Sequence, residues 1–564
     1  TNIQNSVKIF GIAIILNIEV GEKMKMTGAE ALIKMLEDQG TEVVFGYPGA
    51  ANAPIYDELS KSKKIRHILP RSEQAAAHQA SGYALISGKV GVCMATSGPG
   101  ATNLVTGIAT AYADSIPMVA LTGQVATSMI GRDVFQEVDI TGATAPFCKH
   151  SYLVKDPKEL PQIVKDAFYI ASTGRKGPVL IDIPIDVSNA EFEFEEPKPV
   201  NIRGYKPTIK GHNLQIRKVR EAIAASKKPL IIAGGGVGGA KKLLSEFSSK
   251  YSIPVVTTLM GINHTAVCNN LLLGMIGTHG IGVANKAVKE CDLLIVMGAR
   301  LGDRAYTAVH SDNLNSVIIH IDIDPAEIGK NVGTHIPVVG DVETVLKQIM
   351  KQDIDCDIEA NAEWTNSLIK HRDRKREYAD NGGSVNPKMT MNMLSQLTDG
   401  AAIVSTEVGQ NQIWTANNYK VSCDGSLVTS GGLGTMGFGL PAAIGAKVAA
   451  PDKTVVAVEG DGSFQMSLAE LATIKQWNIP IKIIIFNNQR LGMVRELQKV
   501  AYKSNYFAVN LDGSPDFIKL AAAYDIAAVR ISKNSEVEEA LKKLLEGDKP
   551  YLLEIIVDCE ECTL

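Results

Sequence analysis

The sequence predicts an α/β protein with three doubly wound domains, each built on a parallel β-sheet. Short apolar runs of strand length alternate with helical patterns along nearly the whole chain, as in β-α repetition. Gly is frequent, at 50 of 564 residues, and aromatic residues make up only 5%. This composition suits tight loops between buried strands. Two polar stretches interrupt the pattern and divide it into three blocks of ordinary domain size.

The predicted domain boundaries follow those interruptions. We expect residues 1–25 to be an extension outside the fold, because Thr27 and Glu30 have the spacing of a capping box at the first strong helix pattern. The stretch 191–212 is rich in Glu, Pro and Lys, and 351–386 is polar and charged with a helical pattern; both are predicted to be linkers. The predicted domains are 26–190, 213–350 and 387–564.

Each block is expected to contain several buried strands. Strands that helices cover on both faces appear in the sequence as continuous apolar runs, not as alternating patterns. The runs are 42–45, 90–95, 117–121 and 179–183 in the first block, 229–233, 255–258, 293–297 and 317–321 in the second, and 402–405, 455–459, 481–487 and 551–557 in the third.

Charge and composition exclude several classes of function. The chain has 57 Lys and Arg against 61 Asp and Glu, so no basic excess favours a nucleic acid as partner. The apolar stretch 9–20 is too short to cross a membrane as a helix, and no other stretch is suited to it. The eight cysteines are scattered, which favours free thiols in a reducing compartment, predicted to be the cytoplasm.

The most specific chemical signal lies in the third block. Gly460-Asp461-Gly462 follows one predicted strand, and Asn487-Asn488 ends the next. In open α/β sheets ligands bind at the carboxyl ends of strands. A carboxylate, an amide oxygen and a nearby backbone carbonyl suit Mg²⁺, which also binds phosphate oxygens. A lone Gly-Asp-Gly is equally an ordinary turn, so the specificity comes from the pair of motifs.

This pair resembles the thiamine-diphosphate motif, in which about two dozen residues separate the two parts. The resemblance implies that Asp461, Asn488 and the backbone oxygen of Arg490 hold Mg²⁺.

Glu73 opens a helix pattern in the first block, where it would usually be a surface residue that complements the helix dipole. In thiamine enzymes a Glu of the first domain binds the aminopyrimidine, so Glu73 is the expected general acid/base. Ser72 stands where such enzymes usually have His.

Further motifs, from about residue 27 to residue 558, closely resemble the catalytic subunit of acetohydroxyacid synthase (acetolactate synthase). They are 45–49 (FGYPG), 96–100 (TSGPG), 135–137 (FQE), 177–187, 430–437 (SGGLGTMG) and 487–494 (NNQRLGMV). The resemblance implies decarboxylation of pyruvate on thiamine diphosphate. The hydroxyethyl carbanion would pass to a second 2-ketoacid, giving 2-acetolactate or 2-aceto-2-hydroxybutyrate for branched-chain amino-acid biosynthesis. The implied cofactors are thiamine diphosphate, Mg²⁺ and FAD.

The same resemblance assigns the residues around the reaction. Met436 would otherwise be core filler, but in this family an apolar side chain here supports the cofactor in a bent shape. Arg304 would hold the carboxylate of the second ketoacid, with Phe135, Gln136 and Lys149 beside it. Leu497 stands where biosynthetic members usually have Trp. Further contacts to the cofactor are expected from Gly409, Gln410, Asn411, Gly434, Gly460, Gly462, Ser463, Gly492 and Met493.

The middle block carries a glycine-rich loop, residues 234–239, after a predicted strand. This pattern is weak alone, and a tight turn is the plain alternative. The stretch 251–261 lacks the acidic residue that an NAD site wants, so NAD is disfavoured. Leu301 and Gly302 depart from the family pattern. By resemblance FAD would contact Arg175, Gly234, Gly235, His279, Gly280, Gly298, Arg300, Asp322, Asp324 and Asp341.

The resemblance also implies a homodimer or homotetramer with sites shared between subunits, and a small regulatory subunit as partner. Three alternatives remain open at this point. One is a catabolic acetolactate synthase without FAD, and another is a pyruvate oxidase that uses FAD for redox chemistry. The third is a non-catalytic homologue acting as a scaffold or regulatory partner, against which the intact Glu73, Asp461 and Asn488 argue.

Overall fold

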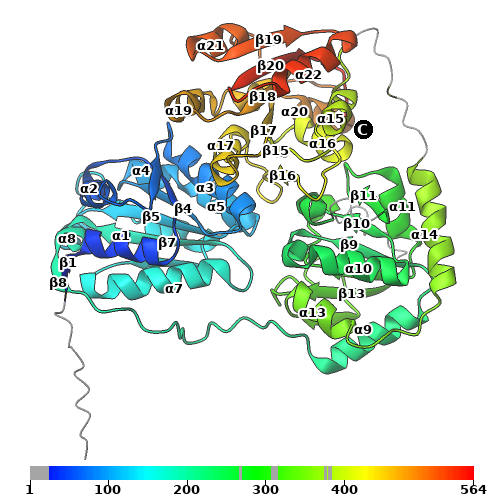
Figure 1. Cartoon of the computed structure of the whole chain (residues 1–564), viewed down its shortest axis with the longest axis horizontal. Coiled ribbons are helices and arrows are strands. Elements are labelled where there is room, and N and C mark those ends of the chain that lie inside the picture. The colour runs from blue at the N-terminus through cyan, green and yellow to red at the C-terminus, as the bar shows by residue number, and fades with distance from the viewer. Residues whose placement is uncertain (1–23, 266–269, 306–315, 374–377, 379–383, 564) are drawn as a thin grey trace, which may run out of the picture.

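The computed structural model describes residues 24–265, 270–305, 316–373, 378 and 384–563. They form three blocks, each with a six-stranded parallel sheet (Figure 1). Alternate residues of a strand enter two different hydrophobic clusters. In β12 (Leu293–Met297), for example, Ile295 packs on one side of the sheet and Leu294 on the other. Each sheet is therefore buried on both faces, which confirms the predicted fold class.

The first block has the strand order β3-β2-β4-β5-β7-β6. Its strands are β2 (Val43–Gly46), β3 (Arg66–Ile68), β4 (Gly91–Ala95), β5 (Met118–Gln124), β6 (His150–Leu153) and β7 (Pro178–Pro184). Its helices are α1 (Gly28–Asp38), α2 (Ala53–Leu59), α3 (Glu73–Ser87), α4 (Pro99–Asn103), α5 (Val105–Ala113), α6 (Ile140–Thr144), α7 (Leu160–Ser172) and α8 (Ile185–Asn189). The predicted capping box is present: the N–H of Glu30 donates to the Thr27 hydroxyl, and the N–H of Thr27 donates to the Glu30 carboxylate.

A small antiparallel pair lies beside this block. It joins β1 (Lys25–Thr27) to β8 (Glu191–Glu193), so Lys25, at the end of the predicted extension, belongs to a strand. Residues 1–23 of that extension lie outside the described residues.

The middle block has the strand order β11-β10-β9-β12-β13-β14. Besides β12 its strands are β9 (Pro229–Ala233), β10 (Val255–Thr257), β11 (Leu272–Met275), β13 (Val317–Asp322) and β14 (Ile336–Val339). Its helices are α9 (Asn213–Ala225), α10 (Lys241–Tyr251), α11 (Gly282–Glu290) and α13 (Val342–Ile349), with the 3₁₀ helices η5 (Gly235–Ala240) and η6 (Leu259–His264). Helix α14 (Ile358–Arg372) lies within the second predicted linker.

The third block has the strand order β16-β15-β17-β18-β20-β19. Its strands are β15 (Ile403–Thr406), β16 (Ser426–Val428), β17 (Val455–Gly460), β18 (Lys482–Asn487), β19 (Ala527–Ile531) and β20 (Tyr551–Ile556). Its helices are α15 (Pro387–Leu397), α16 (Gln410–Asn418), α17 (Gly439–Ala449), α18 (Asp461–Phe464), α19 (Leu471–Trp477), α20 (Gly492–Ala501), α21 (Phe517–Ala523) and α22 (Val537–Leu545).

The first and third blocks share one winding. Numbered along the chain within each block, their strands lie in the order 2-1-3-4-6-5, whereas the middle sheet has the order 3-2-1-4-5-6. In such sheets the crevice for a ligand forms where the winding reverses direction. That point lies between β2 and β4 in the first block, between β9 and β12 in the middle block, and between β15 and β17 in the third.

The first and third blocks are joined by two helices that cross at backbone contact. A Cβ on Gly82 of α3 would lie 2.0 Å from the carbonyl oxygen of Ala442 in α17, and a Cβ on Gly445 would lie 1.8 Å from that of Gln79. Any larger side chain at either glycine would separate the helices. The two elements lie side by side at the centre of Figure 1.

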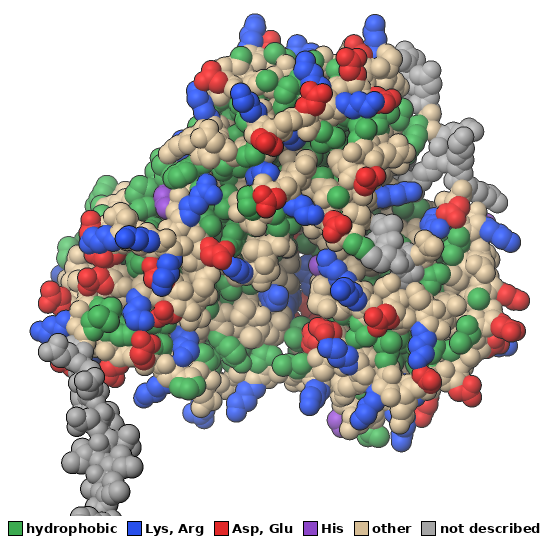
Figure 2. All heavy atoms as spheres, in the orientation of Figure 1, with side chains coloured by type: hydrophobic (Ala, Val, Ile, Leu, Met, Phe, Trp, Pro, Cys, Tyr) green, Lys and Arg blue, Asp and Glu red, His purple; other side chains and the backbone are tan. Residues whose placement is uncertain are grey.

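The surface charges, the helices and the cysteines bear on the classes of protein that the composition excludes. Figure 2 shows acidic and basic side chains interspersed over the visible face, in keeping with the near balance of charges. No helix among the described residues is long and apolar enough to cross a membrane. In the described part of the chain six cysteines are free thiols, namely Cys93, Cys148, Cys291, Cys356, Cys559 and Cys562. Cys423 is disulfide-bonded, so the expectation of free thiols is wrong at that position.

Candidate active site

A pocket opens in the third block at the point where its sheet reverses winding. The chain leaves β15 through Gly409 into α16, and after β18 it enters α20 at Gly492. No side chain caps the N-terminus of either helix. Their first backbone N–H groups therefore make this edge of the sheet suited to an anion.

The pocket collects most of the residues predicted to hold thiamine diphosphate. Those that line it are Gly409, Gln410, Asn411, Met436, Gly460, Asp461, Gly462, Ser463, Asn488, Arg490, Gly492 and Met493. Val408, Trp414, Phe486, Leu491 and Val494 line it as well and were not predicted. Gly434 is not among the lining residues; it has φ +72° in the loop before Met436.

Among the described residues that line the pocket, Asp461 is the one with an acidic side chain, and only 2% of it is exposed. Burial raises the pKa of its carboxyl to about 7, although backbone N–H groups of Asn488 and Gln489 oppose the shift. Its Oδ2 atom is buried and has no hydrogen-bond partner among the described residues. A buried carboxylate oxygen without a partner costs free energy unless a cation or donor binds it, so this oxygen suits Mg²⁺.

The second predicted ligand, Asn488, is held by a chain of polar contacts. Its Oδ1 accepts the N–H of Arg490 at 3.1 Å, and its amide nitrogen donates to Oε1 of Gln410 at 2.9 Å. The amide nitrogen of Gln410 donates in turn to Glu496 at 2.6 Å and to the carbonyl of Glu561 at 2.8 Å. Gln410 therefore acts on Asn488 as a second layer that fixes its orientation.

No cluster of three or more His, Cys, Asp or Glu side chains that could hold a metal occurs in the described part of the chain. The predicted magnesium site needs none, because its protein ligands are one carboxylate, one amide oxygen and one backbone carbonyl. Mg²⁺ commonly binds through one or two carboxylates together with phosphate oxygens and waters. The donor set around Asp461 and Asn488 fits that pattern.

Asn411 lines the pocket, but its side-chain amide, expected to help hold the diphosphate, forms hydrogen bonds within the protein. Its amide nitrogen donates to the carbonyl of Glu407 at 3.2 Å and to that of Val458 at 2.9 Å. Both amide hydrogens are therefore used within the protein. In this structure Asn411 joins the loop that follows β15 to strand β17, and its side chain does not offer a donor to the pocket.

The loop that carries Met436 is held from beneath by Glu407. This carboxylate is fully buried and accepts the N–H of Gly437 at 2.9 Å and that of Gly439 at 2.8 Å. Glu459, also fully buried, lies beside it, and burial raises the pKa of both carboxyls. Sequence reasoning missed Glu407, although it ends a strand at the same edge of the sheet as Asp461.

Glu73 lies at the first position of α3 in the first block, where the hydroxyl of Ser72 caps the helix. Its Oε2 accepts the amide of Asn103 at 2.9 Å, which fixes the direction of the carboxylate. The structure does not bring Glu73 into the pocket: every described residue that lines the pocket belongs to the third block. Within one chain, the described lining of the pocket thus lacks the predicted acid/base.

Of the predicted substrate residues in the first block, Phe135 and Gln136 sit on one loop. Phe135 is 86% exposed, and Gln136 has φ +59° and packs against Gly98. Glu137 holds the loop closed, because its carboxylate accepts the N–H groups of Arg132 and Val134 at 3.2 Å. This closed loop presents an apolar ring to its surroundings.

Lys149 is engaged inside the protein. Its ammonium donates to the carbonyls of Ile170 and Thr173 and to the hydroxyl of Tyr205. Burial lowers the pKa of Lys149 to about 8. All three ammonium hydrogens have partners, so the structure gives Lys149 a structural role, and its place beside a substrate stays a prediction.

The middle block places its glycine loops where its sheet reverses winding, after β9 and β12. They pack backbone to backbone: a Cβ on Gly234 would lie 2.1 Å from the carbonyl oxygen of Gly298, and the N–H of Gly236 donates to that same oxygen at 3.0 Å. Gly235 is less crowded, with Met260 3.4 Å from its would-be Cβ. The location fits a dinucleotide, while Gly234 and Gly298 also have a packing reason for lacking side chains.

Several side chains assigned to FAD are paired with protein groups. Arg175 donates to Asp324 at 3.3 Å and to Glu327 at 2.9 Å, which joins the first block to the middle one. Asp322 is buried, which raises its pKa to about 6, and it accepts the N–H of Asp324. Asp341 caps α13 through the N–H of Thr344.

The other residues assigned to FAD or substrate lie on loops of this block. His279 and Gly280 follow β11, and the His279 carbonyl accepts the amide of Asn417 of the third block at 2.8 Å. Arg304 is largely exposed and lies 3.5 Å from Asp303. Residues 306–315, directly after it, lie outside the described residues.

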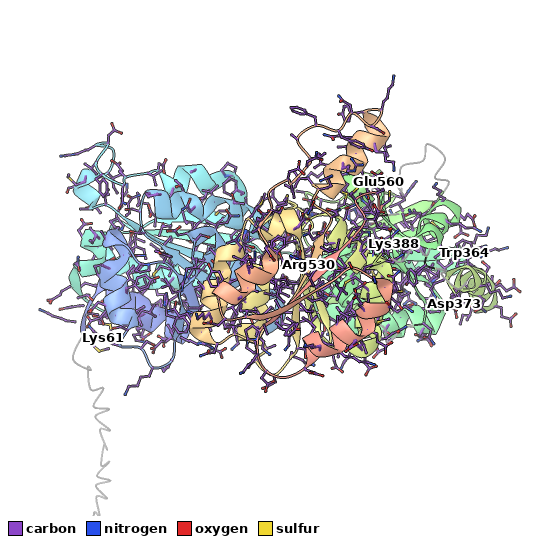
Figure 3. The ribbon with its side chains drawn as sticks, turned by 90° about the horizontal axis from the view of Figure 1, so that it is seen from above. Lys61, Trp364, Asp373, Lys388, Arg530 and Glu560 are labelled. Carbon is purple, nitrogen blue, oxygen red and sulfur yellow. The ribbon has the colours of Figure 1, made fainter. Side chains whose placement is uncertain are left out.

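The last described residues of the chain lie beside the pocket. The carbonyl of Cys562 accepts the indole N–H of Trp414 at 3.1 Å, and Glu496 of α20 binds both the N–H and the hydroxyl of Thr563. Lys499 of α20 lies 3.4 Å from Glu560, which Figure 3 labels together with Lys388 of α15. Sequence reasoning missed Trp414 and Glu496, because neither belongs to a motif.

Comparison with known proteins agrees with this geometry. Residues 26–143 match the thiamine pyrophosphate enzyme N-terminal TPP binding domain, 216–349 the central domain and 407–555 the C-terminal TPP binding domain. The chain is 48% identical to a probable acetolactate synthase large subunit of Methanococcus aeolicus, over 94% of this chain and 92% of that protein. The chain belongs to the acetolactate synthase large-subunit family. It is also 47% identical to the corresponding Methanocaldococcus jannaschii protein and 42% identical to that of Lactococcus lactis, over 95% of this chain and 93% and 94% of those proteins.

Membership in the acetolactate synthase family confirms the resemblance seen in the motifs. It also explains the shared winding of the first and third blocks, because both match domains that bind the same cofactor, thiamine pyrophosphate. The alternatives of a pyruvate oxidase or a scaffold protein are not favoured by these relatives.

Proposed function

We propose that this chain is an acetolactate synthase. It decarboxylates pyruvate and joins the remaining two-carbon unit to a second 2-ketoacid, giving 2-acetolactate or 2-aceto-2-hydroxybutyrate for valine and isoleucine synthesis. The observation that carries the proposal is the pocket in which Asp461 Oδ2 is buried without a partner, next to Asn488 and Met436.

The third block would hold the diphosphate end of the cofactor and Mg²⁺. The N-termini of α16 and α20 offer backbone N–H groups to the phosphates. Asp461, Asn488 and the backbone oxygen of Arg490 are the proposed metal ligands, and Gln410 keeps Asn488 oriented. Once bound, thiamine diphosphate supplies an electron sink for the carbon that loses CO₂.

Glu73 is the proposed general acid/base, since its carboxylate can share a proton with the aminopyrimidine. Asn103 leaves one carboxylate oxygen of Glu73 for that purpose, because it occupies only Oε2. Met436 would support the bent cofactor from the pocket wall. The apolar side chains Val408, Phe486 and Val494 around it exclude water from the reacting carbon.

The separation of Glu73 from the pocket supports a homodimer or homotetramer with shared sites. A pocket lined by the third block alone lacks the acid/base, and a second subunit can supply it. Because relatives are named large subunits, a small regulatory subunit is a proposed partner as well. The compartment we propose is the cytoplasm, which the six free thiols support, although the disulfide at Cys423 does not.

We place FAD in the middle block, at the loops after β9 and β12. Gly235 and Asp322 lie at that edge, and Arg175 and Asp324 would have to exchange their mutual contact for contacts to the cofactor. For the second ketoacid, Arg304 is the proposed carboxylate partner. Phe135, Gln136 and Leu497 would line its site, and Leu497 lies one helical turn from Val494.

The deciding experiment is product analysis. Purified protein with pyruvate, thiamine diphosphate, Mg²⁺ and FAD should form 2-acetolactate and CO₂, and omission of thiamine diphosphate or Mg²⁺ should stop the reaction. Bleaching of the flavin by pyruvate would instead indicate an oxidase, and activity without any bound flavin would indicate the catabolic type. Failure to release CO₂ with all cofactors present would contradict the proposal.

A complementation experiment tests the shared site. Glu73→Ala and Asp461→Ala chains should each be inactive alone, whereas a refolded or co-expressed mixture should regain activity, because a mixed dimer contains one intact site. As a control, mixing Asp461→Ala with Asn488→Ala, both in the third block, should restore nothing. Activity of a monomer at high dilution would contradict the shared site.

A further inference from the structure

The loop that carries Met436 is fixed from outside by residues of other blocks. Residues 430–437 contain four glycines, so the loop has little rigidity of its own. On the side of the first block, the N–H of Gly432 donates to Oδ1 of Asp114 at 2.6 Å. The hydroxyls of Thr110 and Thr435 lie 2.7 Å apart on the same side. The first block thus binds this loop at two points.

The same loop also touches the middle block. A Cβ on Gly431 would lie 2.5 Å from the sulfur of Met260 in η6, and one on Gly432 would lie 2.7 Å from both Oδ1 of Asp114 and the Ala113 carbonyl oxygen. The two glycines therefore lie in a narrow gap between the first and middle blocks, where a side chain at Gly432 would meet backbone and one at Gly431 would displace Met260.

Asp114 is the charged group at this junction. It follows α5, and its surroundings raise its pKa to about 6 by burial, while the N–H groups of Gly432 and Gly431 and the Arg300 guanidinium of the middle block oppose the shift. The carboxylate thus joins the first block to the loop of the third block, near a cation of the middle block. The next residue, Ser115, accepts Nε of Arg175 at 3.0 Å.

Two consecutive residues thus connect the pocket to the middle block. Asp114 holds the Met436 loop and faces Arg300, while Ser115 holds Arg175, which pairs with Asp324. Ser115 has φ +57°, a backbone conformation that is unusual outside glycine. Tertiary contacts, and not the conformational preference of serine, therefore hold Ser115 in this conformation.

We propose that Asp114 is a positioning residue that fixes the Met436 loop and makes its position depend on the middle block. The proposal rests on the proposed function, because Met436 matters to catalysis only where it supports thiamine diphosphate. It assigns the middle block a role at the reacting end of the site, through Met260 against Gly431 and through the contact of Ser115, next to Asp114, with Arg175, in addition to any cofactor of its own. A displacement of about 1 Å at a reacting centre can cost about 10²-fold in rate.

The test compares Asp114→Ala and Asp114→Asn with a matched pair, Asp182→Ala and Asp182→Asn. Asp182 is also a buried carboxylate of the first block that accepts hydrogen bonds, from Thr122 and Gln124, but it does not touch the loop. The first measurement is hydrogen–deuterium exchange of the peptide covering 430–440 in protein without cofactor. The second is exchange of the C2 proton of thiamine diphosphate bound with Mg²⁺.

In Asp114→Ala, amide exchange in that peptide should become about 10- to 100-fold faster, the range for one lost hydrogen bond to a charged group. C2 proton exchange should become slower by a similar factor, with the affinity for thiamine diphosphate changed less than threefold. Asp114→Asn keeps one acceptor oxygen but loses the charge that faces Arg300, so it should lie between Asp114→Ala and the parent.

Three results would overturn the inference: unchanged amide exchange at 430–440, unchanged C2 exchange, or equal acceleration in peptides of every block, which would mean global destabilisation. Equal effects in the Asp182 pair would also overturn it. Failure of the parent protein to bind thiamine diphosphate would instead refute the proposed function. The amide-exchange arm would still decide whether Asp114 fixes the loop.

Discussion

We expect a single added methyl group, in Gly492→Ala, to disturb the proposed metal site strongly. A Cβ added there would lie 1.8 Å from Oε1 of Gln410 and 3.0 Å from the amide nitrogen of Asn488. Real Cβ atoms essentially never come within 3.0 Å of another heavy atom, so Gln410 must retreat by about 1.2 Å in Gly492→Ala. That shift exceeds what a hydrogen bond of 2.9 Å tolerates.

Gln410 cannot retreat without loss, because it is tied to Glu496, Glu561 and Asn488. Each of these hydrogen bonds contributes about 0.5–1.5 kcal/mol net. We expect overpacking to lower the free energy of unfolding by about 1–3 kcal/mol. Asn488 loses the partner that orients it, and loss of such a second-layer contact lowers metal affinity about 10- to 100-fold. The larger effect should therefore fall on Mg²⁺.

The assay is a Mg²⁺ titration in the presence of thiamine diphosphate, followed by tryptophan fluorescence, because Trp414 lines the pocket. Gly282→Ala is the matched control: Gly282 is the first residue of α11, nothing lies within 4 Å of its would-be Cβ, and Ala favours the helix. The control should bind Mg²⁺ as the parent does. A Gly492→Ala protein with Mg²⁺ affinity within twofold of the parent would refute the reasoning.

Three further outcomes are expected. Glu73→Gln should keep the fold and thiamine diphosphate binding but lose about 10²–10⁴ in turnover, since an amide cannot share the proton; near-normal steady-state turnover would exclude the role. Leu497→Trp should raise the share of 2-aceto-2-hydroxybutyrate in a competition between pyruvate and 2-ketobutyrate by about 10–200-fold in discrimination, and an unchanged product ratio would place specificity elsewhere. Burial raises the pKa of Asp182 to about 7, so the folded chain keeps a proton that the unfolded chain releases near pH 4. Asp182 should therefore lower the free energy of unfolding by up to about 1.4 kcal/mol per unit as pH rises from about 4 to about 7, and Asp182→Asn should reduce the slope measured in urea titrations by that amount; an unaltered slope would contradict it.

The strands that sequence reasoning found and missed differ in one physical respect. All twelve predicted runs are strands, and each ends within three residues of its predicted limit. Within the three six-stranded sheets, the strands not predicted are β3, β6, β11, β14, β16 and β19, which are the six edge strands. The short antiparallel pair of β1 and β8 was not predicted either. An edge strand pairs on one side only and is partly exposed, as the partly buried β6 and β19 show, so it does not leave a continuous apolar run.

Among the residues of the site, those that the sequence predicts and those that it does not predict also differ in a physical respect. Asp461 and Asn488 were predicted because both follow strands within one local motif, and the sheet brings such positions to one edge. Glu407 supports the Met436 loop and Gln410 orients Asn488 through contacts between loops, and no spacing in the sequence encodes which loop meets which. The resemblance to the family placed Lys149 near the substrate, whereas three local oxygen atoms engage its ammonium in this structure.

The backbone crossing of α3 and α17 sets an order of events during synthesis. Helix α3 consists largely of small residues and is buried along most of its length. It can pack against α17 only after Gly445, several hundred residues beyond Gly82, has been synthesised. At typical translation rates of about 5–20 residues per second, that interval is on the order of tens of seconds. Throughout it a newly made first block presents an uncovered, alanine-rich surface to the cell. Chaperone binding to nascent chains that end before residue 439 should therefore concentrate on α3 and decline once α17 emerges.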